Sequence, residues 1–281
     1  MVKVYKDYPE AKLVVPEMTK GVVERNNLIY ASYGKRNMHI DLYLPSQRSK
    51  SAGRKLKPVV ILIHGGGWRS GFREMEKPMA LYLASKGYIA AAVEYRLSGE
   101  AKYPAAVNDI QEAIKWIKTN GNKYGIDWKR IALYGTSSGG QIAALVGTNK
   151  FPDKVQAVID IDGVLDMTDP NESGKDRDPA NPSSGKRWFG YTYNEKPELW
   201  REASAINYIN QYSATYCFIN SSLLRFHAGR DSVIKMLNKF NIYSEVHTIS
   251  KTPHTFWLFH PWVDEAREYI TAFLDRTFND R

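Results

Sequence analysis

The sequence predicts a single α/β domain in which a mostly parallel β-sheet is covered on both faces by helices. Short, almost wholly apolar runs recur at residues 57–63, 87–95, 129–134 and 155–161, as expected of strands that are buried on both faces. Segments with apolar residues spaced three or four apart lie between them. Such alternation of strands and helices is typical of an α/β fold.

The first half of the chain supplies most of these elements. Residues 1–25 show no clear period and are expected to wrap around the surface, and residues 27–33 and 38–44 alternate as a hairpin would. A helix is predicted at 74–86, between the strands 57–63 and 87–95. Pro104 begins a helix that runs to Lys118, because proline suits the first turn of a helix.

The second half contains one long irregular segment. Residues 164–211 are rich in Asp, Asn, Pro and Gly with aromatic residues between them, which is typical of a lid or binding insertion. The regular pattern then returns, with expected strands at 222–226 and 242–249 and helices at 232–240 and 262–278. A length of 281 residues is near the upper size of one hydrophobic core, so we expect one domain over residues 1–281 with the insertion at 164–211.

Composition excludes several classes of protein. The apolar runs are too short to span a bilayer, so no membrane span is predicted. The net charge is +9, but the first 57 residues hold most of the surplus, and the basic loop 48–57 is expected to be solvated rather than to bind nucleic acid. The single Cys217 excludes an internal disulfide and a cysteine-rich metal site, and is expected to fill space in a strand or loop. We predict no cofactor and no metal.

The sequence leaves compartment and oligomeric state open. No signal peptide is visible at the N-terminus, because residues 2–10 are charged and lack an apolar stretch. The protein is expected to be secreted or periplasmic if a leader has been removed, and cytoplasmic otherwise.

Residues 135–139, Gly-Thr-Ser-Ser-Gly, fit the G-x-S-x-G pattern between a predicted strand and a helix of small residues. In this pattern a sharp turn holds the serine hydroxyl clear of the sheet, and the glycines allow the neighbouring chain to approach closely. Ser137 is therefore the candidate nucleophile. The alternative is that these small residues only serve packing at the junction.

A nucleophilic serine needs a base, and the base needs an orienting acid. His254 follows the last predicted strand, where a loop can project it above the sheet edge, and it is preferred to His260. Asp231 follows predicted strand 222–226, one helix and one strand before His254, so both would emerge at the same end of the sheet. The competitors lie near the end of the preceding strand: Asp162 is the first alternative, followed by Asp160 and Asp166.

An ester carbonyl attacked by serine becomes an oxyanion, which needs preorganised N–H donors. The successive glycines of His64-Gly65-Gly66-Gly67 leave their amides uncovered, and the amide of Ser138 lies at the start of a helix. The alternative is a plain glycine-rich turn.

Together with Glu94-Tyr95-Arg96-Leu97, Tyr103-Pro104-Ala105 and residues 227–233, His-Ala-Gly-Arg-Asp-Ser-Val, these motifs resemble the α/β-hydrolase serine esterases of the hormone-sensitive-lipase and feruloyl/acetylxylan-esterase type. The resemblance covers residues 26–278. It implies an eight-stranded, mostly parallel sheet whose second strand is antiparallel, with the insertion after the sixth strand. It also implies an ion pair between Arg96 and Asp109. The implied site residues are catalytic Ser137, Asp231 and His254, with an oxyanion hole from Gly66, Gly67 and Ser138.

The predicted activity is hydrolysis of carboxylic esters through an acyl-enzyme. On the resemblance and on the aromatic insertion, whose rings could stack on sugars, we expect a carbohydrate esterase that removes acetyl groups from a plant polysaccharide such as xylan or pectin. Trp68, Trp188 and Trp257 are the expected substrate-binding residues. Five alternatives stay open: a feruloyl esterase, a short-chain carboxylesterase, a pectin methylesterase, an amidase of the arylformamidase type, and a non-catalytic homologue. The aromatic residues of the insertion could also serve packing alone.

Overall fold

A computed structural model describes residues 2–17, 19–46, 55–174 and 180–278 of the chain. Most of the predicted basic loop 48–57 and part of the insertion, residues 175–179, lie outside the described residues. None of the helices in the described part combines the length and apolar character that crossing a bilayer requires.

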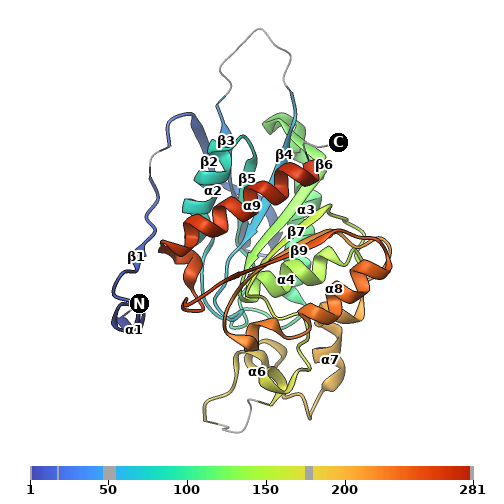
Figure 1. The fold of residues 1–281 in the computed structure, drawn as a ribbon. Helices are drawn as coiled ribbons and strands as arrows, with labels where there is room; N and C mark the ends of the chain where they lie inside the picture. The colour runs from blue at the N-terminus through green and yellow to red at the C-terminus, as the bar shows by residue number, and fades with distance from the viewer. Residues whose placement is uncertain (1, 18, 47–54, 175–179, 279–281) are drawn as a thin grey trace.

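The centre of the molecule is an eight-stranded sheet in the order β2-β3-β5-β4-β6-β7-β8-β9 (Figure 1). Strand β3 is antiparallel to both of its neighbours, β2 and β5, and the remaining pairs are parallel. The predicted parallel sheet with an antiparallel second strand is therefore confirmed. The strands are β2 (Val22–Tyr33), β3 (Arg36–Pro45), β4 (Lys57–Ile63), β5 (Ile89–Val93), β6 (Ile126–Thr136), β7 (Ala157–Ile161), β8 (Thr215–Ser221) and β9 (Ser244–Ile249).

Helices cover both faces of the sheet. Helices α3 (Ala105–Tyr124), α4 (Ser138–Gly147) and α8 (Arg230–Lys239) share one core cluster with Val59, Ile61 and Ile63. Helices α2 (Lys77–Ser85) and α9 (Trp262–Phe278) share the other with Val60 and Leu62. Successive side chains of β4 thus enter opposite cores, because strand residues alternate between faces, and this is why the central runs are apolar throughout.

The insertion between β7 and β8 forms α5 (Pro170–Ser173), α6 (Ser184–Phe189), α7 (Pro197–Glu202) and the 3-10 helix η2 (Ala205–Asn207). Figure 1 shows α6 and α7 together beyond one end of the sheet. A Cβ atom built on Gly67 would lie 2.9 Å from Ser184 Oγ, so α6 covers the loop that follows β4. The insertion therefore lies at the carboxyl end of the parallel strands.

The first residues wrap around the surface, as expected. Helix α1 (Val2–Asp7) leads to β1 (Lys12–Leu13), which pairs with β10 (Phe259–His260) in a separate two-stranded sheet. Short 3-10 helices connect other elements: η1 (Arg73–Glu76), η3 (Leu224–His227) and η4 (Phe256–Leu258).

The prediction of a strand at residues 222–226 is wrong. Strand β8 instead spans Thr215–Ser221, whose residues are buried from Tyr216 onward, between β7 and β9. The apolar pair that suggested a strand, Leu223 and Leu224, is 44% and 80% exposed. Helix α8 also begins earlier than predicted, at Arg230 rather than Ser232. This shift decides which acid reaches the site.

Candidate active site

Ser137 lies on a sharp turn between β6, which ends at Thr136, and α4, which begins at Ser138. Its backbone has φ 52° and ψ −117°, a conformation that non-glycine residues seldom adopt and that is found at functional sites. Its N–H donates to Ile161 O at 2.7 Å, which ties the turn to the end of β7.

The two motif glycines permit this turn. A Cβ atom on Gly135 would lie 2.2 Å from Gly139 O, and one on Gly139 would lie 2.1 Å from Ile63 O. Both contacts are with backbone atoms, so no side-chain rotation could relieve them. The glycine pattern thus reflects the close approach of β4, β6 and α4, as the motif predicts.

His254 joins this serine to a buried acid. Its Nε2 lies 2.9 Å from Ser137 Oγ, and its Nδ1 lies 3.0 Å from Asp162 Oδ2. The Asp162 side chain is fully buried, and the imidazole is 26% exposed. The loop after β9 thus brings His254 to Ser137, as the sequence predicts.

The expectation that Asp231 is the acid partner of His254 is wrong. The Asp231 side chain is 73% exposed and pairs with Arg230 at 2.9 Å. This hydrogen bond from Arg230 is the main reason why the pKa of Asp231 is lowered. Because α8 begins at Arg230, Asp231 lies in its first turn and its carboxylate faces solvent. The alternative acid, Asp162, occupies the position instead.

The Asp162 carboxylate has a donor at each oxygen besides His254. Ser221 donates twice, from its amide to Oδ1 at 2.8 Å and from its hydroxyl to Oδ2 at 2.7 Å. Asn220 Nδ2 lies 3.3 Å from Oδ1. A buried carboxylate needs such partners, since an unpaired one carries a large desolvation cost. Its neighbour Asp160 is also buried, and burial is the main cause that raises the pKa of Asp160 to about 7.

The glycine loop lies beside the nucleophile. A Cβ atom on Gly65 would lie 3.3 Å from the Ser137 Cβ atom. Gly66 and Gly67 have φ values of 131° and 61°, which favour glycine, and the amides of Gly66, Gly67 and Ser138 donate to no acceptor among the described residues. Free amides in these places are what an oxyanion hole requires.

His64 anchors the start of this loop. Its ring stacks on Tyr95 at 4.4 Å, and its Nδ1 donates to Gly65 O at 2.8 Å. Burial lowers the pKa of His64, which favours the neutral imidazole. A neutral ring fits a structural role between β4 and the glycines.

The three predicted substrate-binding tryptophans are all buried. Trp68 and Trp188 stack on each other at 4.6 Å, with 7° between their planes, and are 6% and 0% exposed. Trp257 is 8% exposed and meets the His254 ring edge-on at 5.1 Å. The faces of Trp68 and Trp188 cover each other, so they join the insertion to the sheet, which is the packing alternative stated above.

Sequence reasoning missed the neighbours of the His254–Asp162 pair. Phe226 stacks flat on the His254 ring at 3.7 Å, and the Arg225 guanidinium covers Phe226 at 4.8 Å. Arg225 is in turn paired with Glu172 of the insertion at 2.5 Å. A usable signal was the polar pair Asn220-Ser221 at the end of an otherwise apolar stretch, because polar residues at a strand's carboxyl end often face a site.

Other features of the described residues lie away from Ser137. The Arg96 guanidinium is paired with buried Asp109 at 2.7 Å, as the resemblance implies. The ligating atoms of Cys217, Glu245 and His247 lie within 4.8 Å of one another, but Glu245 is already paired with Arg276 and with His247.

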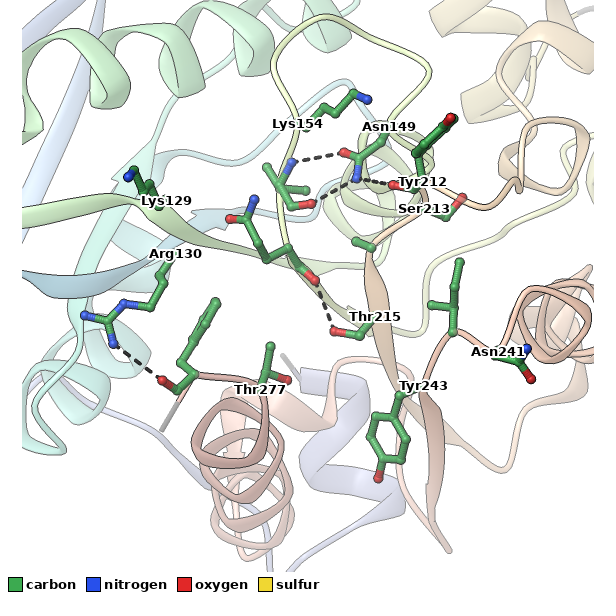
Figure 2. Close-up of a pocket in the computed structure, with 15 residues that line it drawn as sticks. Lys129, Arg130, Asn149, Lys154, Tyr212, Ser213, Thr215, Asn241, Tyr243 and Thr277 are labelled. Atoms are coloured by element: carbon green, nitrogen blue, oxygen red, sulfur yellow. Dashed lines mark hydrogen bonds between the residues drawn. The ribbon is translucent and has the colours of Figure 1, made fainter. Parts of the chain in front are cut away.

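A groove of about 740 Å³ lies at the opposite end of the sheet from Ser137, and Figure 2 shows the residues that line it. Its lining includes Lys129 and Arg130 near the start of β6 and Thr215 at the start of β8. This groove is therefore separate from the serine site.

The comparisons with known proteins agree with this architecture. Residues 40–238 match the BD-FAE family model. The chain belongs to the BD-FAE family of α/β-hydrolase esterases.

Two relatives named as esterases illustrate the range of similarity. Esterase LipC of Mycobacterium tuberculosis is 27% identical over 73% of this chain and 52% of its own length. Probable carboxylesterase 5 of Arabidopsis thaliana is 26% identical over 97% of this chain and 95% of its own length. The chain thus spans about half the length of the first of these relatives.

Solved structures share the fold at lower identity. A truncated form of a carbohydrate esterase from gut microbiota matches 90% of this chain and 96% of its own, with a TM-score of 0.72 and 20% identity. A bifunctional GH43-CE protein of Bacteroides eggerthii matches 91% of this chain and 38% of its own, with a TM-score of 0.74 and 24% identity. These likenesses establish the α/β-hydrolase fold.

Proposed function

We propose that this protein is a serine hydrolase of carboxylic esters, with Ser137 as nucleophile, His254 as base and Asp162 as orienting acid. The observation that carries the proposal is the pair of hydrogen bonds that joins these side chains, 2.9 Å from Ser137 to His254 and 3.0 Å from His254 to Asp162. Membership of the BD-FAE family supports it.

The geometry accounts for each proton. Asp162 accepts a hydrogen bond from the Nδ1–H of His254, so that Nε2 is free to accept the proton of Ser137 as Oγ attacks the ester carbonyl. The amides of Gly66, Gly67 and Ser138 would stabilise the oxyanion that forms. Collapse releases the alcohol, which His254 protonates, and leaves an acyl-enzyme. Water activated by His254 then releases the acid and restores Ser137.

Within this class we propose acetyl esters of a plant polysaccharide such as xylan or pectin as substrate. Support comes from structural neighbours named as carbohydrate esterases. We also expect a small acyl group, because Trp68, the residue after Gly67, is buried against Trp188.

The decisive test compares the wild type with Ser137→Ala on 4-nitrophenyl acetate. Loss of the nucleophile should lower kcat by about 10³-fold or more, because the remaining groups cannot form the acyl-enzyme. Equal rates would refute serine catalysis. Release of acetate, methanol and ferulate from acetylated xylan and pectin then separates an acetyl esterase from a methylesterase or a feruloyl esterase.

A further inference from the structure

The Asp162 carboxylate is held by a layer of side chains that extends from the site to the surface of α8. Ser221 contacts both carboxylate oxygens, through its amide at 2.8 Å and its hydroxyl at 2.7 Å. Two donors from one residue fix the plane of the carboxylate, since rotation about the Cβ–Cγ bond would break both hydrogen bonds. The oxygen that faces His254 is therefore set by Ser221.

The side-chain amide of Asn220 adds a further donor to Asp162, and Arg230 helps to orient this amide. Asn220 Nδ2 lies 3.3 Å from Asp162 Oδ1, and Asn220 Oδ1 accepts from Arg230 at 3.0 Å. Arginine can only donate, so it keeps the amide oxygen on its own side and the NH₂ group toward the carboxylate. Without Arg230 only the contacts of Nδ2, to Asp162 and to Phe226 O at 3.4 Å, would hold this orientation, and a turned amide would place two oxygen atoms against each other.

Asp231 completes this layer from outside. It pairs with Arg230 at 2.9 Å, and the Arg230 side chain is only 13% exposed. A continuous chain of hydrogen bonds thus runs through Asp231, Arg230, Asn220, Asp162, His254 and Ser137. Asp231, which the sequence suggested as the acid, thus lies at the outer end of this chain, and Asp162, which contacts His254, lies within it.

Arg230 also supplies charge where two carboxylates are buried. Asp160 and Asp162 lie two residues apart and are both fully buried. The charge of Asp162 raises the pKa of Asp160 further, whereas the charge of Arg230 lowers it. A guanidinium that is mostly withdrawn from solvent is screened less than a surface cation, so its effect on Asp160 is felt more strongly.

We infer that Ser221, and Arg230 acting through Asn220, are positioning residues that hold the Asp162 carboxylate in the orientation that His254 requires. This inference rests on the proposed function, because it assigns a task to residues that touch neither substrate nor nucleophile. Within the motif at 227–233, Arg230 donates to Asn220 at 3.0 Å, and His227 Nε2 donates to Ser221 O at 2.8 Å.

The test uses two variants, Ser221→Ala and Arg230→Met, each with a matched control. Ser232→Ala removes an exposed hydroxyl, and Lys235→Met removes an exposed cation from the same helix. We expect Ser221→Ala to lower kcat roughly 10- to 100-fold, the range for losing a hydrogen bond to a charged group, with KM unchanged. Arg230→Met should lower kcat roughly tenfold, since it acts through Asn220. The kcat of both control variants should stay within about twofold of the wild-type kcat.

Two further measurements exclude a merely structural effect. First, kcat is normalised to active sites titrated with a fluorophosphonate, so that misfolded protein does not count. Second, the low-field proton NMR resonance of the His254–Asp162 hydrogen bond, identified by its absence from His254→Ala, should shift or broaden in both variants. That resonance needs no substrate, so it tests the positioning layer even if the esterase proposal fails.

The inference is overturned if both variants keep the wild-type resonance, or if their losses vanish once kcat is normalised to titrated sites. If Ser221→Ala does not fold, Arg230→Met decides alone, because Arg230 lies at the start of a surface helix. Failure of the esterase proposal would appear separately, as equal activity of the wild type and Ser137→Ala.

Discussion

Replacing Asp162 with asparagine is the sharpest test of which acid orients His254. Asp162 Oδ1 accepts a hydrogen bond from Ser221 N–H at 2.8 Å and lies 3.3 Å from Asn220 Nδ2. Both neighbours are donors, so in the variant the amide oxygen must occupy the place of Oδ1. The NH₂ group then takes the place of Oδ2 and points at His254 Nδ1. It can only donate there, which drives the imidazole proton to Nε2.

A proton on Nε2 blocks general-base catalysis, because that nitrogen lies 2.9 Å from Ser137 Oγ and must accept its proton. The same substitution of a triad aspartate, which leaves the geometry intact but selects the wrong tautomer, lowers kcat by about 10⁴-fold. We expect a loss of that order for Asp162→Asn, with little change in KM.

Asp231→Asn is the matched control, because it removes the same charge and keeps the same shape. Its carboxylate is 73% exposed and touches Arg230 rather than His254. An exposed ion pair contributes little free energy to holding its partner in place, so we expect the kcat of Asp231→Asn to fall by less than about threefold. The assay is hydrolysis of 4-nitrophenyl acetate at one pH, with thermal unfolding to verify the fold. A larger loss at Asp231, or more than a tenth of wild-type kcat in Asp162→Asn, would refute the assignment.

Two further predictions concern stability. Trp188→Ala should lower the free energy of unfolding by about 3–5 kcal/mol, because the ring is fully buried against Trp68; urea titration measures this, with exposed Tyr191→Ala as control. Glu76→Gln should stabilise the protein increasingly between pH 4.5, the ordinary pKa of Glu, and pH 8. Burial raises the pKa of Glu76 to about 8, so over that range unfolding ionises the carboxyl. The free energy of unfolding of the wild type therefore falls by on the order of 1 kcal/mol per pH unit.

The outcomes that contradict these two predictions are specific. Equal losses for Trp188→Ala and Tyr191→Ala would mean that the stack does not join the insertion to the sheet. For Glu76, melting curves at pH 4, 6 and 8 are compared with those of exposed Glu74→Gln. A stabilisation by Glu76→Gln that is as large at pH 4 as at pH 8 would contradict a raised pKa of Glu76 in the folded protein.

The fold was largely predictable because its central strands carry a strong local signal. The run at 57–63 is apolar on both faces, since its residues enter two different cores, and it became β4 with the same bounds. The closing helix was likewise predicted at the residues of α9. Residues 215–226 could not be read correctly, because Leu223 and Leu224 carry an apolar signal although they are exposed.

The sequence by itself determined the parts of the site whose geometry is local. The turn that presents Ser137 needs glycine at 135 and 139, and the loop at 64–67 needs glycine to expose its amides, so residue type and spacing were enough. His254 was within reach because it directly follows the last strand of the sheet.

Only the tertiary structure decided the acid and the role of the tryptophans. Asp162 and Asp231 both follow parallel strands, and the choice between them depends on where β8 ends and α8 begins, which cross-strand pairing and helix packing determine together. Whether Trp68 and Trp188 face a substrate or each other likewise depends on how the insertion folds back onto the sheet. Local patterns specify what a turn can present, but the partner of a buried side chain is selected by contacts between segments far apart in the chain.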